Sequence, residues 1–370
     1  MTRRLAFLVP AGLSLLAGLD AALLLLGVRA PVTTDRLPDA HGFLLVLGFV
    51  GTVIALERAV ALRRPGGFAS PVLLGIGGVL LFSPAPIWAG QLSLTLGCAA
   101  MVALYVPLWQ RQRDDSVLVQ LLGAVLATGA ALLWLRGVPA SDLIPWLAGF
   151  VVLTIAGERL ELARVVVLDA TATGRLVAVS GAIVAGTVAS LLWPVAGYPL
   201  TALAYLALVA WLLVHDVATR TIRATGLTRF MAGCLLLGYA WLVVAALIWL
   251  VHGHVGEGPA YDAVVHAFFL GFTISMIMAH APVILPAVLR VRLPYHPVMI
   301  APPALLHAGL LLRLLVGDGW GVTVAAQVGG VLGVVALLGF VVVSAWAVVA
   351  ASRRDHARSA SRLESRVVSS

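Results

Sequence analysis

Hydrophobic residues along this chain fall into long runs that are separated by short polar or glycine- and proline-containing stretches. A bilayer core about 30 Å thick requires roughly 20 apolar residues per helix. By that measure the sequence predicts twelve membrane-spanning α-helices. Their expected ranges are 5–27, 41–62, 70–88, 91–109, 117–135, 142–166, 175–193, 198–215, 229–251, 261–283, 297–316 and 321–350.

The composition agrees with this pattern. Hydrophobic residues make up 61% and charged residues 11% of the chain, and the mean hydropathy is +1.06. No soluble domain with a polar surface has such a composition. We therefore expect an all-α polytopic membrane protein, in contact with a lipid bilayer, whose single transmembrane domain comprises residues 1–350. Residues 351–370 predict a basic tail that is disordered.

The basic residues indicate an orientation. All 24 are arginines, and about twenty lie at the N-terminus, in alternate loops or in the tail. Because cytoplasmic loops carry an excess of basic residues, both termini are expected in the cytoplasm of a bacterial-type plasma membrane. Orientation alone then explains the net charge of +8, so we expect no nucleic-acid partner.

One sequence template recurs in three predicted helices. The second contains "LGFVGTVIALER", the sixth "AGFVVLTIAGER" and the tenth "LGFTISMIMAHA". When the Gly-Phe pairs are aligned, the ninth residue after the glycine is Glu57, Glu158 and His280 in turn. Three copies, four helices apart, predict three four-helix units around a pseudo-threefold axis. The alternative is chance recurrence of Gly-Phe pairs in alanine- and leucine-rich helices.

Ionisable residues in these helices fall into two layers. His41 and His266 stand in the first outer turns of the second and tenth helices, and Glu57, Glu158 and His280 belong to the inner layer. At 1.5 Å per residue the inner layer is about 20 Å deeper. Two histidines at one depth on two helices suit bis-imidazole ligation of a haem iron. The simpler interpretation of either histidine alone is a helix-start residue in contact with interfacial water.

Three more residues extend the haem hypothesis. Arg313, near the outer end of the eleventh helix, could bind haem propionates through paired hydrogen bonds, or it could extend to the outer interface. His280 and His307 lie deeper and could form a second site that lines an open coordination position or binds copper. A core histidine bonded to a backbone carbonyl is the commoner arrangement.

Two acid–base pairs lie near the expected cytoplasmic surface. Glu57-Arg58 and Glu158-Arg159 fit either interfacial ion pairs or the mouth of a proton or cation route. In the second case Glu57, Glu158 and His280 would form the polar constriction of a proton- or metal-ion-coupled transporter without haem. Transporter repeats are usually inverted, whereas a four-helix repeat preserves orientation.

The remaining candidate ligands carry weaker signals. His252 and His254, in the outer loop "VHGHVGEGPAYD", fit either a metal site or an ordinary wet loop. Cys98 and Cys234 lie far apart in apolar runs and lack metal-site spacing, so we expect them to be packing residues.

Twelve helices with histidines at the outer ends of the second and tenth resemble the catalytic subunit of haem-copper oxidases. In that family these helices carry the ligands of a low-spin haem, which by position would be His41 and His266. The stretches "HGFLLVLGFV" and "HAFFLGFTISMI" are also similar to the His-x-x-Leu-x-Gly-Phe pattern of NnrS, a related twelve-helix family associated with haem, copper and nitric oxide stress. The resemblance covers the topology of the whole chain, but its motifs are confined to two helices.

The chain departs from the oxidases in its metal ligands. The His-Pro-Glu-Val-Tyr element of their sixth helix, the His-His pair of their seventh and the His-x-His of their tenth are missing; the sixth helix here offers Glu158 and Glu161. An oxygen-reducing haem-copper centre is therefore not expected. The resemblance implies a protein that binds haem, b-type first, in electron transfer or in handling nitric oxide or another diatomic molecule. If it is an enzyme, it is a haem-dependent oxidoreductase that lacks the usual copper-site histidines.

The resemblance also implies partners. These would be a redox protein, subunits of a respiratory complex, or further copies of this chain. A subunit that only supports the assembly of a larger complex is a third alternative, in addition to the haem protein and the transporter.

Overall fold

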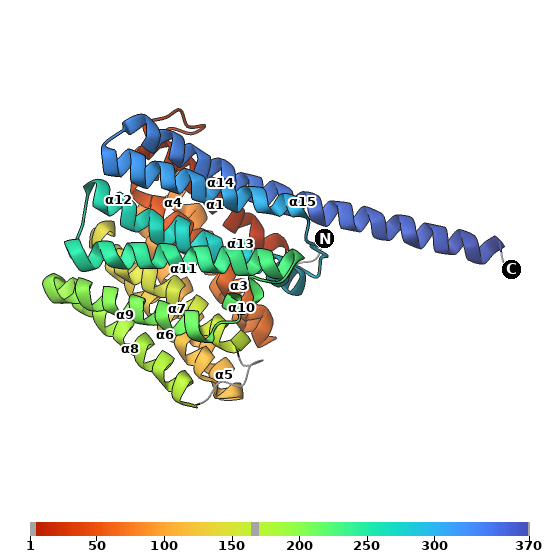
Figure 1. Ribbon diagram of the computed structural model, residues 1–370, viewed down its shortest axis with the longest axis horizontal. Helices are drawn as coiled ribbons and strands as arrows, with labels where there is room; N and C mark the ends of the chain where they lie inside the picture. The colour runs from red at the N-terminus through yellow and green to blue at the C-terminus, as the bar shows by residue number, and fades with distance from the viewer. Residues whose placement is uncertain (1–4, 164–169, 369–370) are drawn as a thin grey trace.

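The computed structural model describes residues 5–163 and 170–368, and within these ranges it contains helices and no strands (Figure 1). Twelve of the described helical stretches are long and apolar enough to cross a membrane, and each overlaps one range predicted from the hydrophobic pattern. The predicted all-α fold is confirmed, and the chain is an integral membrane protein. The spans are Ala6–Leu25, Arg36–Leu62, Pro65–Phe82, Ile87–Arg111, Asp115–Leu135, Ala140–Leu162, Ala170–Leu192, Pro194–His215, Gly226–His252, Gly258–Leu289, Pro297–Asp318 and Thr323–Arg353.

Some spans are single α-helices and others are composite. The single helices are α1 (Leu5–Leu25), α5 (Ile87–Gln112), α6 (Asp115–Leu135), α8 (Ala170–Leu192), α9 (Pro194–His215), α11 (Gly226–His252) and α15 (Thr323–Val368). Short 3-10 helices begin three spans: η2 (Pro65–Phe68) before α4 (Ala69–Phe82), η3 (Ala140–Leu143) before α7 (Ile144–Ala163), and η5 (Pro297–Ile300) before α14 (Ala301–Leu311).

Three spans contain a π-helical segment. The second span is α2 (Arg36–Phe43), the π-helix η1 (Leu44–Gly51) and α3 (Thr52–Leu62). The tenth is α12 (Gly258–His266), the π-helix η4 (Ala267–Ile274) and α13 (Ser275–Leu289). The eleventh ends in the π-helix η6 (Leu312–Asp318), and a short helix, α10 (Ala218–Thr221), lies in the loop after α9.

Both ends of the described chain lie at the same end of the bundle, which we call the termini end (Figure 1). α15 extends far beyond the bundle there and is helical through Val368. Its side chains beyond Arg353 lie outside the described residues, and the disorder expected of the basic tail stays a prediction.

Arginines end three of the helices at the termini end. Arg63, Arg113 and Arg290 follow α3, α5 and α13, and each adopts a left-handed backbone conformation, with φ of 58°, 48° and 57°. This conformation turns the chain out of the helix and satisfies free carbonyl groups, as glycine more often does. A cationic side chain there also interacts favourably with the helix dipole.

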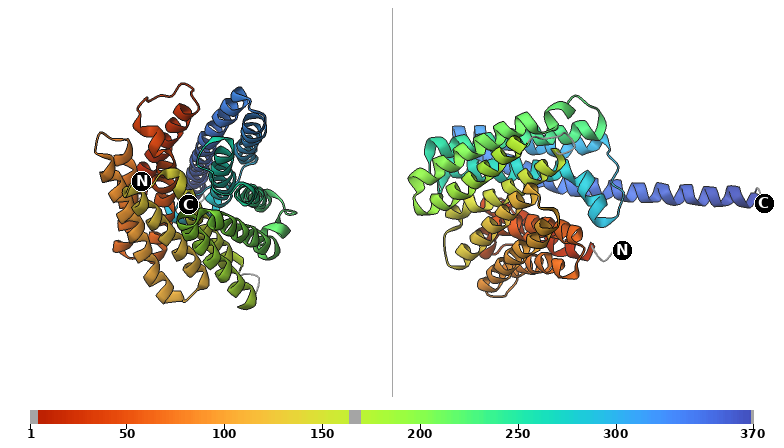
Figure 2. Two further views of the ribbon diagram at one scale, coloured as in Figure 1. Left: turned by 90° about the vertical axis from the view of Figure 1, so that its left-hand side faces the viewer. Right: turned by 90° about the horizontal axis from the view of Figure 1, so that it is seen from below.

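The three spans that share the sequence template are the most deeply buried. Within their most apolar windows, 67%, 78% and 67% of the residues of the second, sixth and tenth spans are buried, against 56% or less elsewhere. α3 packs on α13, and α7 packs on η4. An end-on view shows these helices surrounded by the others (Figure 2). The template therefore belongs to the helices on which the bundle is assembled.

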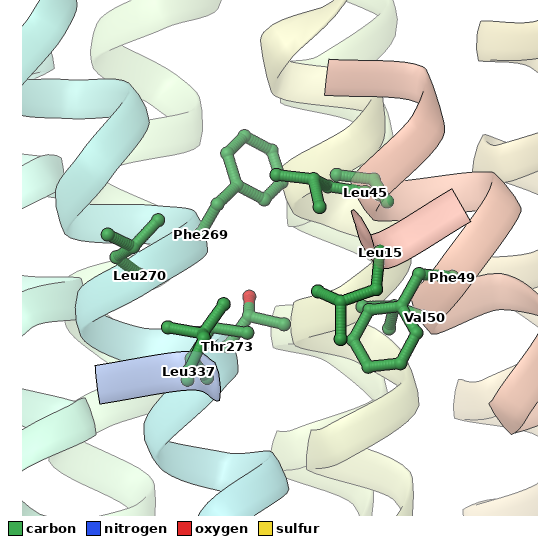
Figure 3. A pocket seen from close by; sticks show the side chains of 10 residues that line it. Leu15, Leu45, Phe49, Val50, Phe269, Leu270, Thr273 and Leu337 are labelled. Atoms are coloured by element: carbon green, nitrogen blue, oxygen red, sulfur yellow. The ribbon is translucent and has the colours of Figure 1, made fainter. Parts of the chain in front are cut away.

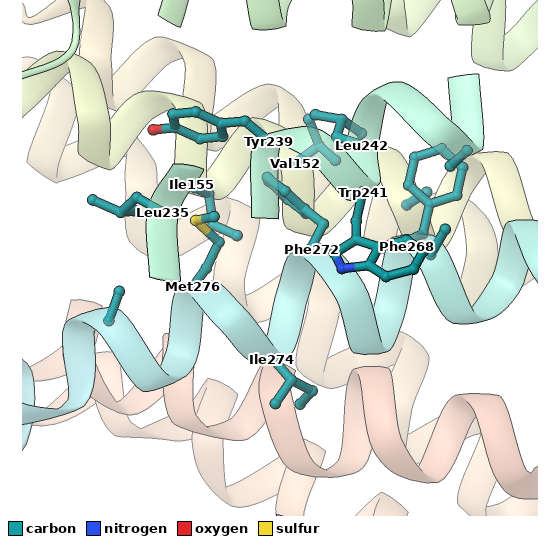
Figure 4. Close-up of a cluster of buried hydrophobic side chains, with 14 of the residues drawn as sticks. Val152, Ile155, Leu235, Tyr239, Trp241, Leu242, Phe268, Phe272, Ile274 and Met276 are labelled. Atoms are coloured by element: carbon teal, nitrogen blue, oxygen red, sulfur yellow. The ribbon is translucent and has the colours of Figure 1, made fainter. Parts of the chain in front are cut away.

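The template glycines make this close packing possible. Gly48 lies against Gly78 of α4, Gly149 against Leu126 of α6, and Gly271 against Trp241 of α11. A methyl group at any of these glycines would lie too close to its neighbour. Around Gly271, aromatic side chains from α11 and η4 fill the core between them (Figure 4).

Candidate functional site

His41 and His266 lie at the end of the bundle opposite the termini. The Nδ1 atom of His41 lies 2.9 Å from the carbonyl oxygen of Gly18, in α1. The Nδ1 atom of His266 lies 2.8 Å from the carbonyl oxygen of Asp262, one turn earlier in α12. His41 is within electrostatic range of His266, Asp262 and Arg313, although these residues come from different spans. The structure thus brings the two predicted ligands into one region.

These contacts determine which nitrogen of each ring is free. A carbonyl oxygen only accepts hydrogen bonds, so Nδ1 of a neutral imidazole must be the donor in both contacts. The lone pair then resides on Nε2, and among the described residues neither Nε2 atom has a hydrogen-bond partner. Metal-binding histidines are typically oriented in this way, with one nitrogen donating to a carbonyl or carboxylate and the other facing the metal.

An apolar cavity lies between the second and tenth spans (Figure 3). The free space inside it is about 30 Å³, well below the roughly 300–1,000 Å³ typical of ligand pockets, so a larger group would enter only if the lining side chains moved apart. Its only polar lining residue is Thr273. Four lining residues come from η1 and four from η4, with one each from α1 and α15: Leu45, Val46, Phe49, Val50, Phe269, Leu270, Thr273, Ile274, Leu15 and Leu337.

The two histidines stand on the helix faces that line this cavity. Leu45 follows His41 by four residues, and Phe269 and Leu270 follow His266 by three and four. Residues at these spacings lie on the same face of a helix. His41 and His266 each therefore precede the lining residues of their own span by about one helical turn.

The π-helices occupy the same register in both copies of the template. Gly48 is the fifth residue of η1, and Gly271 is the fifth residue of η4. Hydroxyl groups support the loosened backbone, since Thr52 donates to the carbonyl of Gly48 at 2.7 Å and Thr273 to that of Phe268 at 3.0 Å. π-Helical segments are rare and occur frequently at functional sites. The sixth span carries the same Gly-Phe pair in an ordinary α-helix.

The sequence suggested two roles for Arg313, propionate binding and extension to the outer interface. Its contacts show a third. Its Nε and Nη2 atoms donate to the two carboxylate oxygens of Asp262 at 2.7 and 2.6 Å. Asp262 also lies 3.2 Å from Nδ1 of His266. Arg313 therefore fixes the carboxylate that orients His266, and two of its nitrogens are unavailable to a propionate. The third, Nη1, lies against Gly330, where a Cβ atom would be 2.8 Å away.

His280 and His307 are buried but are held in separate hydrogen-bond networks. His280 contacts the carbonyl of Met276 through Nδ1 at 2.7 Å and Arg159 through Nε2 at 3.2 Å. His307 accepts a hydrogen bond from Trp241 at 3.0 Å, and its Nε2 atom lies 3.4 Å from the hydroxyl of Ser275. With both nitrogens of each ring engaged by protein groups, the deeper paired site expected from the sequence is not formed by these contacts.

A second polar cluster, at the termini end, joins the three template helices. Arg58 lies 2.5 Å from Glu57, 4.0 Å from Glu158 and 3.7 Å from Glu161. Arg159 contacts His280 from the other side. Glu57 and Glu158 thus meet at Arg58, and His280 contacts Arg159, the residue that follows Glu158.

Arg159 forms an ion pair with a residue that is distant in sequence. Its Nε and Nη2 atoms donate to both oxygens of Asp216 at 2.6 and 2.7 Å, and Tyr239 donates to Asp216 at 2.6 Å. Burial alone would raise the pKa of Asp216, but the hydrogen bonds from Arg159, Tyr239 and the Ala218 backbone hold that pKa below its usual value. The expected Glu57-Arg58 pair is therefore formed, whereas Arg159 pairs with Asp216 rather than with Glu158.

The remaining candidate metal ligands do not lie close to one another. His254 contacts Asp142 at 2.9 Å, and both cysteines are buried and free. Among the described residues, no group of three or more histidine, cysteine, aspartate or glutamate side chains could hold a metal ion. Any metal at this protein would need either fewer protein ligands or a cofactor that supplies the rest.

The sequence did not reveal the acidic residues that contact His266, Arg313 and Arg159. Asp262 was passed over as part of a loop, although it precedes His266 by four residues and therefore shares its helix face. Asp216 carried no such local signal, because its partner Arg159 is 57 residues away. Tyr105, which is buried beside Arg58, was also indistinguishable from a core aromatic residue.

Comparison with known proteins identifies the family. Residues 4–349 match the family model described as Domain of unknown function (DUF8744). The chain belongs to this family. The match includes all the histidines and acidic residues of both clusters described above, so the family model spans the whole site. No curated protein and no solved structure matches the chain.

Proposed function

We propose that this protein is a haem-binding membrane protein in which Nε2 of His41 and Nε2 of His266 are the axial ligands. The observation that carries the proposal is that the two imidazole rings have the same hydrogen-bonding pattern. Each donates Nδ1 to a carbonyl, each keeps a free lone pair on Nε2, and each precedes by about one helical turn the residues of its own span that line the cavity. Imidazole binds iron as the neutral base, through a nitrogen whose lone pair is free.

The residues around the cavity have the apolar character that the ring of a haem needs, and their side chains would have to move apart to admit it. Leucine, valine and phenylalanine side chains of η1 and η4 face each other there (Figure 3). They would exclude water from the ring, while Gly18 and Asp262 hold the two imidazoles in orientation. The bound group would supply one-electron chemistry at its iron. The b-type is favoured, because no cysteine lies among the residues that line the cavity.

The arrangement favours electron transfer over handling of nitric oxide or another diatomic molecule. If His41 and His266 both held the iron, no protein-free coordination position would remain for a small molecule. The deeper histidines that could have lined an open position, His280 and His307, are saturated by protein hydrogen bonds. A redox protein or respiratory subunit would then be the partner, and we propose no copper centre.

The proposal includes an orientation and an internal symmetry. Four arginines, Arg29, Arg36, Arg136 and Arg313, belong to the opposite end, and the other arginines among the described residues fall at the termini end or in the tail. Because basic residues are retained inside, the termini would be in the cytoplasm of a bacterial-type membrane. The deep burial and convergence of the three template helices support three four-helix units around a pseudo-threefold axis.

The transporter hypothesis finds less support in the contacts. Glu57 and Glu158 do meet, at Arg58, and His280 contacts Arg159, the residue that follows Glu158. However, Arg58 and Arg159 occupy the positions between them, and a guanidinium group repels a passing metal cation. We therefore keep the haem protein as the proposed function.

The test is an absorption spectrum of the full-length protein, expressed with ample haem and purified in mild detergent. Oxidised and dithionite-reduced samples are compared, and haem is quantified against protein. A Soret band with sharp α and β bands on reduction, at about one haem per chain, is expected of bis-histidine ligation. A protein that folds under these conditions and contains no haem would contradict the proposal.

A further inference from the structure

We infer that Glu57 and Glu158 form a proton-binding site at the termini end, in which the two carboxyl groups hold one proton between them. This site is separate from the histidines at the opposite end and does not depend on haem. Both carboxylates approach the same guanidinium nitrogen, Nη2 of Arg58, at 2.5 and 4.0 Å. They therefore share one small, mostly buried space, with side chains 19% and 12% exposed.

The charges in this space do not balance. Three carboxyl groups, those of Glu57, Glu158 and Glu161, face Arg58, and the other nearby guanidinium group, Arg159, is already neutralised by Asp216. Glu161 is half-exposed and can be solvated by water. Arg58 is therefore the one cation that faces the two buried acids, Glu57 and Glu158. Two carboxylates that share a site resist losing both protons.

An unpartnered hydroxyl group points to the same place. Tyr105 of α5 is buried, with 1% of its surface exposed, and its hydroxyl has no hydrogen-bond partner among the described residues. It is within electrostatic range of Arg58, Glu158, Glu57 and Glu161. Buried polar groups in native proteins nearly always find a partner. A carboxyl group or a proton-carrying water beside Tyr105 would provide one.

The occupant is a proton rather than a metal ion. Arg58 stands among the acids and would repel a sodium or divalent ion, whereas a proton binds covalently to one carboxylate and needs no coordination shell. The remaining groups of the cluster do not compete for it, because Asp216 and Tyr239 bind Arg159 and both nitrogens of His280 are engaged. Half-exposed Glu161 connects the pair to solvent at the termini end.

The test is infrared spectroscopy of the full-length protein at neutral pH, in light and in heavy water. We expect a protonated-carboxyl carbonyl band that shifts down in heavy water and disappears in both Glu57→Gln and Glu158→Gln. Either substitution removes the repulsion, so the remaining acid loses its proton. Glu161→Gln is the matched control and should keep the band at wild-type intensity.

A second variant covers the case in which a glutamine variant does not fold. Tyr105→Phe changes no charge, and loss of the buried hydroxyl group beside the pair should shift the frequency of the carbonyl band. Sodium should have no effect on the spectrum. Survival of the band in either glutamine variant, its absence from the wild type at neutral pH, or its removal by sodium would overturn the inference.

Discussion

Arg159 and Asp216 are joined by two hydrogen bonds of 2.6 and 2.7 Å, in a buried ion pair that connects the sixth span to the loop after the eighth. Asp216 accepts further hydrogen bonds from Tyr239 and from the backbone of Ala218. Through Arg159 the pair also reaches His280 in the tenth span. This network fixes the termini end of the bundle independently of the histidines at the other end.

The first prediction concerns stability in acid. Because the pKa of Asp216 is lowered in the folded state, the pair stabilises the protein fully above the unfolded-state pKa of about 3.9, and the contribution is lost as pH falls through the folded-state value. Asp216→Asn should lower the unfolding free energy at neutral pH by about 3 kcal/mol, because it leaves Arg159 buried without its charge partner. Thermal unfolding in detergent between pH 7 and about pH 3 measures both effects.

The control for that experiment is Asp142→Asn. Asp142 pairs with His254 at 2.9 Å, but both side chains are more than a third exposed. Exposed pairs contribute only about 0–1 kcal/mol, so this variant should unfold like the wild type. If both variants lost the same stability, the assignment of a special role to the buried pair would fail.

The second prediction concerns the template glycines. A Cβ atom at Gly271 would lie 2.6 Å from Cβ of Trp241, whose ring is fixed by its hydrogen bond to His307. Gly271→Ala should therefore lower stability by about 1–3 kcal/mol. At Gly12, in α1, a Cβ atom would meet nothing within 4 Å, so Gly12→Ala should be neutral or slightly stabilising. Equal melting temperatures for the two variants would refute the packing explanation of the template.

The third prediction concerns the residue that orients His266. Asp262→Asn weakens the bond to Arg313 and the electrostatic support of the His266 ring. Loss of such an outer partner typically lowers metal affinity about 10–100-fold. Transfer of haem from the purified protein to an excess of apomyoglobin should accelerate accordingly. Glu257→Gln, an exposed acid at the start of the same helix, is the control and should transfer haem at the wild-type rate.

The fourth prediction tests the orientation. Thr33→Cys places a thiol in the exposed loop between α1 and α2, and Gly66→Cys places one in the exposed turn between α3 and α4, at the termini end. The native cysteines, Cys98 and Cys234, are buried and should react little. In intact cells a membrane-impermeant maleimide should label Thr33→Cys and not Gly66→Cys, and both after lysis. The reverse pattern would place the termini outside.

The sequence was sufficient for those features that depend on local pattern. Runs of apolar residues predicted the twelve spans, because the bilayer imposes one length on every helix. Alignment of the Gly-Phe pairs predicted that Glu57, Glu158 and His280 are related positions; the first two meet at Arg58, and His280 contacts Arg159. His41 and His266 were chosen from their depth alone, and the structure brings them into one region.

Features that depend on tertiary contacts could not be predicted. The π-helices η1 and η4 have no signature in the residue pattern, since the sixth span carries the same Gly-Phe pair as an ordinary α-helix. Arg159 was assigned to its sequence neighbour Glu158, by the same adjacency that correctly pairs Arg58 with Glu57. Its true partner became visible only when the loop after α9 was placed beside α7.

The measurement that tests the central claim most directly is the reduced absorption spectrum of His41→Ala and of His266→Ala, each compared with His254→Ala. His254 lies at the same end of the bundle, hydrogen-bonds to Asp142 and packs against the ring of Tyr198, so its substitution controls for the loss of a histidine there. The account predicts that each of the first two variants folds but loses the sharp α band, and that His254→Ala keeps the wild-type spectrum. An unchanged spectrum in either His41→Ala or His266→Ala would show that the ring is not a ligand and would contradict the account.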